Sequence, residues 1–536
     1  MSERDHGTGK EVHWGLGGWR LGGWRLGGWW RSAWPHVSVA VLAMALLLWP
    51  VRNVVPLFDG WLFARCALDA PWIAVRCEGH VSGGWGLLMA LGKLWTIPGA
   101  TSLFLPSLVF GAIALAGVDR MAAAVLRGDA RVERALLVVA LAVHPSFVST
   151  VLQPNLDLAL MAWACWMFAG VARERLLEVV CFGTLMIFSK ETGLFLYGAA
   201  SLVMWWRAVT RSEGVRTSIA LAVPLLLFAG FLFLRKPEHM YLSGGTVATS
   251  SNFHPLDLWS RQLLNYGVLI GVLNYQWVVV GGCIAAAVAA IRVRAVRWSL
   301  WRDVTSPAVR VGWTLGVALV LVTSYRTFGN VRYFVFVLPF VPLAMLVAFR
   351  AASVPPWVSR GLICGWGLLL VSASQSSADP LMQRIAGTFS TGPGVMYDMT
   401  HVARECCGRG RDQLVYNLQY TDFARAMDSA MVRIGAARGV VVAMSIYGHW
   451  HAVTPVDGAT SRRVMTGGIA VPLVYTEDLA RGVESVDHAW LVEWPITASV
   501  RESLRDRYTV RDAGGVTSGG VTLRLAELTR RVEEKR

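Results

Sequence analysis

The sequence predicts a polytopic α-helical membrane protein with about 11 transmembrane helices and a C-terminal extramembrane α/β domain. The chain has 536 residues, of which 54% are hydrophobic and 16% charged, and its mean hydropathy is +0.47. Soluble domains carry about 25% charged residues. The apolar residues gather in runs of about 15–25 residues separated by short arginine-bearing loops, as in membrane-spanning helices. From about residue 390, short apolar and polar stretches alternate instead.

Residues 1–35 form a segment of low complexity that we expect to be a cytoplasmic tail. The sequence Leu-Gly-Gly-Trp-Arg at 16–20 recurs at 21–25, and Leu-Gly-Gly-Trp follows at 26–29. No small-residue cleavage pattern follows the first apolar run, so we do not expect a cleavable signal peptide. Tryptophan and arginine together suit a membrane surface with anionic lipids, whereas a disordered tail is the alternative.

Eleven apolar runs follow, and together they predict a transmembrane domain over residues 36–375. Arg127, Arg173, Arg207 and Arg350 are among the many arginines that fall on one side of the membrane under this count. The positive-inside rule makes that side the cytoplasm. We expect the protein to lie in the inner (plasma) membrane. The runs lie near residues 36–55, 102–126, 135–151, 156–172, 176–189, 191–206, 217–234, 263–291, 310–326, 333–349 and 358–375.

The C-terminal segment is expected to be a separate domain on the outer side. Residues 376–389 form a linker, and residues 390–536 a periplasmic or extracellular α/β domain. Its short apolar stretches at 413–416, 439–442 and 489–492 are typical of strands. An odd number of spans places this domain on the same side as the first outer loop, residues 56–101.

The net charge of +15 does not predict nucleic acid binding in this chain. Such a charge on a soluble domain would indicate it. Here the arginines separate the apolar runs, so membrane topology and contact with anionic lipid headgroups explain the charge. We therefore expect membrane lipids as partners and no nucleic acid.

Ionisable residues beside the apolar runs are the candidate functional residues, because a carboxylate at membrane depth is costly and indicates function. Asp59 directly follows the first run, and Asp157 lies between two later runs, both on the outer side. The loop 56–101 also holds Glu78, His80 and four tryptophans, a mixture typical of an amphipathic layer on the membrane surface. An ordinary interfacial loop in which Asp59 caps a helix is the alternative.

Six short motifs occur in order over about residues 50–350. They are Phe58-Asp59-Gly60, Glu78-Gly79-His80, Leu103-Phe104-Leu105-Pro106-Ser107, Pro154-Asn155-Leu156-Asp157, Ser189-Lys190-Glu191-Thr192-Gly193, and Arg332-Tyr333 leading into Leu338-Pro339. This series resembles the GT-C glycosyltransferase superfamily, most of all the dolichyl-phosphate-mannose protein mannosyltransferases and the bacterial lipid A aminoarabinose transferases. The chain lacks the family's second acid after Asp59, the prolines after His80 and one arginine before Leu103, which indicates a divergent bacterial member.

The resemblance implies an inverting hexosyl- or pentosyltransferase that moves a sugar from a polyprenyl-phosphate carrier to an acceptor hydroxyl on the outer face of the membrane. Asp59 would be the catalytic base. Glu78 and Glu191 would support the site, and the acceptor would be a glycan, a lipid or a protein. The residues expected to bind the donor phosphate and sugar are His80, Asp157, Lys190, Arg326, Arg332 and Tyr333.

Other readings of the sequence stay open. No ligand cluster requires a metal, although Asp59, Glu78 and His80 could gather a divalent cation. A lipid or solute transporter or flippase would show charges facing a mid-membrane cavity and inverted repeats, but the halves show no repeat and the charges gather at one interface. A non-catalytic envelope scaffold is the other alternative. The spacing of Cys66 and Cys77 leaves open whether they form a disulfide.

Overall fold

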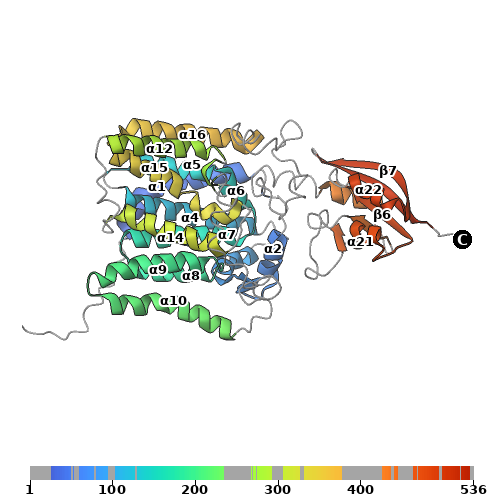
Figure 1. Ribbon diagram of the computed structural model, residues 1–536, viewed down its shortest axis with the longest axis horizontal. Coiled ribbons are helices and arrows are strands. Elements are labelled where there is room, and N and C mark those ends of the chain that lie inside the picture. Colours follow the sequence, from blue (N-terminus) through green and yellow to red (C-terminus); the bar gives the residue numbers. More distant parts are fainter. Residues whose placement is uncertain are drawn as a thin grey trace, which may run out of the picture.

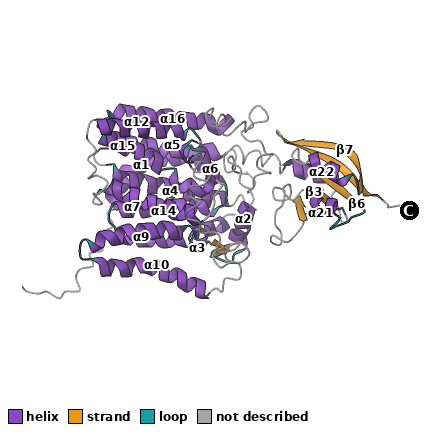
Figure 2. Ribbon diagram, in the orientation of Figure 1, coloured by secondary structure: helices purple, strands orange, loops and turns teal. Residues whose placement is uncertain are grey.

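The structure is a computed structural model of the whole chain, and its helices lie side by side in one bundle (Figure 1). Figure 2 shows that almost all of the strands belong to a sheet beyond one end of this bundle. The residues that the structure describes are 26–49, 52, 59–77, 80–94, 103–126, 129–234, 267, 270–272, 274–292, 306–325, 331–376, 425–435, 440–444, 463–466, 469–493, 498–518 and 521–531.

The apolar helices follow the order that the sequence predicts. Among the described residues, Phe104–Val125, Gly214–Leu234 and Arg332–Ala351 are long and apolar enough to cross a membrane, and one bent pair raises this count from 3 to 4. The remaining apolar helices are shorter, so the count of about 11 spans is not confirmed. The unbroken helices are α1 (Leu26–Leu48), α4 (Phe104–Val125), α7 (Leu156–Ala172), α8 (Leu176–Ile187), α9 (Gly193–Val209), α10 (Gly214–Leu234), α12 (Gln276–Arg292), α14 (Pro307–Tyr325) and α16 (Pro356–Ser376).

The helix α1 begins earlier than the run at 36–55 predicted, because its buried face extends toward the N-terminus. Ala33, Val37, Ala40, Met44 and Leu48 recur at helical spacing, and all are buried. The last copy of the Gly/Trp repeat therefore lies in the helix rather than before it.

Two of the predicted helices are broken at prolines. The run expected as one helix over 135–151 forms α5 (Arg131–Ala142) and α6 (Pro145–Leu152), which are bent by 57°. Pro145 has no N–H to continue α5, and the Nδ1 of His144 accepts from the Ser146 N–H at 3.2 Å to begin α6. The run at 333–349 likewise divides into the 3-10 helix η6 (Val331–Val337) and α15 (Phe340–Ala351), on either side of Pro339.

The loop 56–101 contains a compact layer that packs against α7 and the C-terminal end of α8. The Gly84 N–H donates to the Phe188 carbonyl at 2.9 Å, and the Trp163 indole donates to the Gly84 carbonyl at 3.3 Å. Trp85 is fully buried. The layer consists of α2 (Asp59–Asp69), the β1 (Arg76–Cys77) and β2 (His80–Val81) hairpin, α3 (Gly83–Met89) and the 3-10 helix η2 (Ala90–Leu94).

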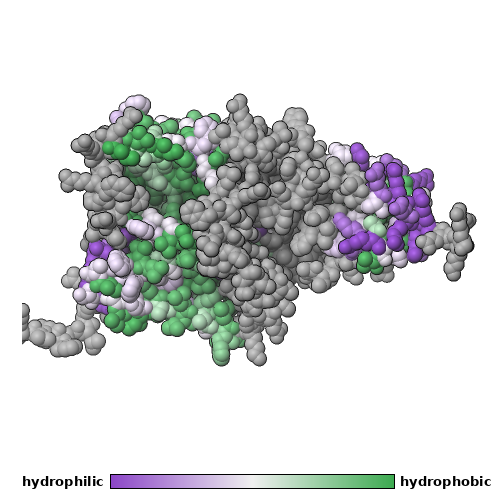
Figure 3. All heavy atoms as spheres, viewed as in Figure 1, coloured by the Kyte–Doolittle hydropathy of each residue, from purple (hydrophilic) through white to green (hydrophobic). Residues whose placement is uncertain are grey.

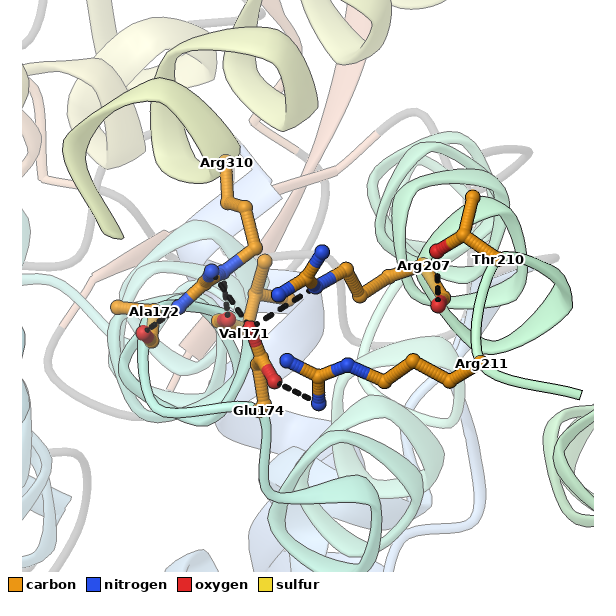
Figure 4. Close-up of polar contacts among 7 residues, drawn as sticks. All are labelled: Val171, Ala172, Glu174, Arg207, Thr210, Arg211 and Arg310. Atoms are coloured by element: carbon orange, nitrogen blue, oxygen red, sulfur yellow. Dashed lines mark hydrogen bonds and ion pairs between the residues drawn. The ribbon is translucent and has the colours of Figure 1, made fainter. Parts of the chain in front are cut away.

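At the opposite end of the bundle, one carboxylate joins three helical segments (Figure 4). Glu174 lies in the α7–α8 turn with a left-handed φ of 55°. Its Oε1 is 2.7 Å from Arg310 of α14 and 3.2 Å from Arg207 of α9, and its Oε2 accepts from Arg211 at 2.5 Å. Arg310 is buried and also donates to the last carbonyls of α7. We call this the arginine-rich end; its arginines include Arg131, Arg173, Arg207, Arg211, Arg310 and Arg350.

The outer surface of the bundle is apolar over the middle of its helices. Figure 3 shows hydrophobic side chains over the helices and hydrophilic ones over the sheet. Such a surface suits the hydrocarbon of a bilayer rather than water. The exposed hydrophobic residues include Leu42, Leu46, Leu202, Ile219, Leu226 and Phe233.

The C-terminal strands form a six-stranded sheet, as the sequence predicts for a domain in this region. The strand β3 (Val442–Met444) pairs in parallel with β5 (Ile469–Tyr475) and β6 (His488–Glu493), and the other pairs are antiparallel. The stretches expected at 439–442 and 489–492 fall at β3 and β6, while 413–416 lies outside the described residues. The sheet order is completed by β4 (Arg463–Thr466), β7 (Tyr508–Ser518) and β8 (Val521–Arg530), with α21 (Thr476–Arg481) and α22 (Ala498–Leu504) between strands.

Replacing Gly84 by alanine should destabilise the protein, because a Cβ there would lie 2.1 Å from the Leu185 carbonyl oxygen. We expect Gly84→Ala to lower the free energy of unfolding by about 1–3 kcal/mol. The neighbouring Gly83→Ala is the matched control, since the nearest atom to its Cβ would be 3.8 Å away. Thermal unfolding of the purified protein measures both, and equal melting temperatures would contradict the packing of α3 on α8.

Candidate functional site

A buried ion pair lies at the end of the bundle that faces the α2–α3 layer. Asn155 caps α7 by accepting from the Leu158 N–H at 3.0 Å, which places Asp157 in the first helical turn. Lys190 comes from the turn between α8 and α9, where its carbonyl accepts from the Gly193 N–H at 2.9 Å. The Lys190 ammonium donates to the Asp157 carboxylate at 2.5 Å, and both residues are buried.

A second cation approaches the same carboxylate from η6. The Arg332 Nε lies 3.8 Å from the Asp157 Oδ2, and Arg332 is buried. The ring of Tyr333 lies 4.4 Å from the Lys190 ammonium and 5.3 Å from the Arg332 guanidinium. We call Asp157, Lys190, Arg332 and Tyr333 the Asp157 cluster. Two cations share one carboxylate there, so these four residues together carry one net positive charge.

The residue after Lys190 forms a second pair. The Glu191 Oε2 lies 2.9 Å from the His80 Nδ1, and its Oε1 accepts from the Val81 N–H at 3.0 Å. Burial alone would raise the pKa of Glu191. The hydrogen bond from His80 and the charge of His80 lower it by more than burial raises it, so the pKa lies below its ordinary value. The pair fixes the β1–β2 hairpin to the α8–α9 turn, directly beside the Asp157 cluster.

The structure thus brings together six of the nine residues that the sequence singled out, in two adjoining groups. Asp59 is the first residue of α2, and the ring of Phe63, one turn later, lies 6.0 Å from the ring of His80. The side chain of Asp59 and all of Glu78 and Arg326 lie outside the described residues, so their predicted roles stay predictions.

The described part of the chain holds no group of three or more His, Cys, Asp or Glu residues suited to a metal ion. The predicted divalent-cation site depends on Glu78 and on the side chain of Asp59. Neither is described, so the structure does not test it.

Sequence reasoning missed a buried polar network that fixes the break before α6. The Gln276 amide contacts the His144 Nε2 at 3.3 Å, and Asn274 donates to the Ser146 hydroxyl at 2.9 Å. All four residues are buried, and Asn274 has a left-handed φ of 56°. The network holds α6, which packs against η6 and leads into the Asp157 turn. The signal for it was the His144-Pro145 pair inside an apolar run.

Comparison with solved structures identifies the fold. The chain is similar to ArnT from Cupriavidus metallidurans, both in the apo state and bound to undecaprenyl phosphate. Each comparison has 15% sequence identity and a TM-score of 0.50, and covers 91% of this chain and 97% of the ArnT chain. No protein-family model matches the chain, and no curated protein matches its sequence. The chain therefore has an ArnT-like helical fold with a C-terminal sheet domain.

Removing the charge of Asp157 should destabilise the site end of the bundle. Asp157→Asn leaves the Lys190 ammonium buried without its counter-ion, so we expect the free energy of unfolding to fall by about 3–5 kcal/mol. The double variant Asp157→Asn/Lys190→Met removes both charges and should lose less than the two single changes add up to. Denaturant unfolding of the wild type, the two single variants Asp157→Asn and Lys190→Met, and the double variant measures this coupling. Strictly additive losses of unfolding free energy would show that the pair does not form.

The low pKa of Glu191 predicts a pH-dependent stability. A carboxylate whose pKa in the folded protein lies below its ordinary value of 4.5 stabilises the fold above that pH, and this contribution is lost as the pH falls further. We expect the melting temperature of the wild type to fall more between about pH 6 and about pH 3.5 than that of Glu191→Gln. The exposed Glu213→Gln serves as control and should follow the wild type; identical pH profiles for Glu191→Gln and wild type would contradict the prediction.

Proposed function

We propose that this protein is a membrane glycosyltransferase that transfers a sugar from a polyprenyl-phosphate carrier to an acceptor hydroxyl. The observation that carries the proposal is the Asp157 cluster, in which two buried cations share one carboxylate at the end of an apolar bundle. A polyprenyl phosphate has an apolar tail and an anionic head, which match the apolar helix surface and the surplus charge. The likeness to ArnT, one structure of which holds undecaprenyl phosphate, supports this choice.

The cluster is arranged to bind a phosphate without large rearrangement. Lys190 and Arg332 would donate charge-assisted hydrogen bonds to the phosphate oxygens. Asp157 holds the Lys190 ammonium by a 2.5 Å hydrogen bond and faces the Arg332 guanidinium at 3.8 Å, so it keeps both cations in position before the ligand arrives. The Tyr333 ring confines both cations from the side.

The chemical step would be a single displacement. Asp59 takes the proton of the acceptor hydroxyl, and the acceptor oxygen attacks the anomeric carbon from the face opposite the phosphate. The bond between that carbon and the phosphate oxygen breaks, its electron pair stays on the lipid phosphate, and the configuration inverts. Lys190 and Arg332 stabilise the negative charge that develops on the leaving phosphate. Glu191 fixes the ring of His80, which in its protonated form would add a third cation.

The proposed site faces the outer side of the inner (plasma) membrane. The positive-inside rule assigns the arginine-rich end to the cytoplasm, and the Asp157 cluster lies at the other end. The α2–α3 layer lies at the end with the cluster, and Figure 1 shows the sheet domain beyond that same end. We propose that this domain contacts the acceptor, which is a glycan, a lipid or a protein.

Two variants separate donor binding from chemistry. Asp59→Asn should lower sugar transfer by about 100-fold or more, because the base is lost, while the affinity for undecaprenyl phosphate stays unchanged. Lys190→Met should weaken both undecaprenyl phosphate binding and transfer. Transfer is measured from the envelope glycans and lipid-linked sugars of a deletion strain complemented at matched membrane abundance, and binding with the purified protein.

The matched control for the base is Asp69→Asn, since Asp69 is the last residue of the same helix α2 and should be dispensable for transfer. Full complementation by Asp59→Asn would show that Asp59 is not the base. If the deletion changes no glycan and Lys190→Met binds undecaprenyl phosphate like the wild type, the transferase proposal is wrong.

A further inference from the structure

The arginine-rich end contains a cavity that the proposed reaction does not use. Its volume is about 540 Å³, within the range of about 300–1,000 Å³ typical of small-molecule sites. It lies where α4 and α15 end and where α5, α14 and α16 begin. Apolar side chains form much of its wall, and its rim includes exposed residues of the turn between α15 and α16. The apolar wall includes Val125, Leu126, Val347 and Phe349.

The polar part of the wall combines a guanidinium with a buried carboxylate. The side chain of Arg350 is 33% exposed, and its Nη2 lies 3.8 Å from the Glu133 Oε2. Glu133 is almost fully buried, and its Oε1 accepts from Arg360 at 3.0 Å. Its Oε2 accepts no hydrogen bond from the described residues. The hydroxyl groups of the wall belong to Ser306, Ser353 and Ser359.

We propose that this cavity binds the headgroup of a phospholipid that carries both a phosphate and a primary ammonium, as phosphatidylethanolamine does. Arg350 and the hydroxyls of Ser306 and Ser353 would donate to the phosphate, while the Ser359 hydroxyl donates to the Pro356 carbonyl at 3.0 Å. The ammonium would donate to the Glu133 Oε2, which lies 3.8 Å from the Arg350 guanidinium and accepts no hydrogen bond from the described residues. Buried acceptors in folded proteins usually have a donor. The apolar wall would take the glycerol and the first acyl carbons.

The carboxylate determines which headgroup fits. A free phosphate ion would match Arg350 but would be repelled by Glu133. A choline headgroup carries the same phosphate and positive charge as ethanolamine, but its nitrogen has no N–H to donate. The cavity should therefore prefer ethanolamine to choline lipids.

Its position also suits a lipid of the adjacent leaflet. The cavity lies at helix ends, at the level where headgroups meet a membrane protein. The span Arg332–Ala351 runs from the Asp157 cluster to this cavity. The inference does not rest on the proposed transferase function, because binding at this end needs neither donor nor acceptor.

The test uses the purified full-length protein in detergent, with phosphatidylethanolamine, phosphatidylcholine or inorganic phosphate added. Bound lipid is counted by native mass spectrometry, and the melting temperature is recorded. We expect phosphatidylethanolamine to bind about tenfold more tightly than phosphatidylcholine and to raise the melting temperature more. Glu133→Gln should remove this preference. Arg350→Gln should instead weaken the binding of both lipids, because both carry the phosphate that Arg350 binds. Arg131→Gln is the matched control and should keep the preference, since the Arg131 side chain is 74% exposed and is not part of the cavity wall.

Each comparison between lipids is made within one variant, so a loss of stability in Glu133→Gln does not obscure the result. Arg350→Gln tests the same site from a partly exposed position, where glutamine leaves the helix packing intact. Equal binding of the two lipids to the wild type would overturn the proposal. So would a full preference retained in Glu133→Gln, or unchanged binding of both lipids to Arg350→Gln. Inorganic phosphate reproducing the whole stabilisation would also overturn it, because that would show an anion site instead.

Discussion

The ion pair between Lys190 and Asp157 is the interaction on which the site end of this protein depends. A lone ammonium or carboxylate at this depth would be strongly disfavoured, so each residue requires the other. The pair forms only if α7 begins at its Asn155 cap and α8 ends three residues before Lys190. The turn that carries Lys190 also carries Glu191, which holds the β1–β2 hairpin through His80. One contact therefore positions two helices, and its neighbour attaches the outer layer.

The same kind of contact, one carboxylate shared by several cations, also occurs at the arginine-rich end. Three carboxylates there are each shared by two or three arginines: Glu174 binds three, Glu178 contacts Arg120 and Arg175, and Glu133 contacts two. In lipid, apolar burial alone gives little drive for helices to associate. Ion pairs between segments supply directional contacts at both ends, while small residues and aromatic rings pack between them. Such contacts explain how helices that are individually too short to count as membrane spans can still form one bundle.

The sequence predicts which residues form the Asp157 cluster better than it predicts where the helices begin and end, and the reason is physical. Asp157, Lys190, Arg332 and Tyr333 could be grouped in advance because each belongs to a short motif beside a helix end. The helix boundaries were harder to predict. Hydrophobicity averaged over a window does not detect the one missing N–H at Pro145, so the sequence predicted one helix where the structure has α5 and α6. The network of His144, Asn274 and Gln276 escaped notice because its members are far apart in the chain and only the fold brings them together.

The hydrogen bonds also separate the roles of the site's carboxylates. A catalytic base needs an oxygen free to take a proton from the acceptor. Asp157 is engaged by Lys190 and faces Arg332, and both oxygens of Glu191 are held, one by His80 and one by the Val81 N–H. Among the acidic residues of the motifs, this leaves Asp59 and Glu78 for proton transfer. Asp59 begins the helix whose next turn packs against His80, so its backbone already lies beside the fixed end of the site. The residue after Asp59 is Gly60 rather than a second acid, so the proposed reaction assigns the base to the Asp59 carboxylate itself, with Glu78 as the other candidate.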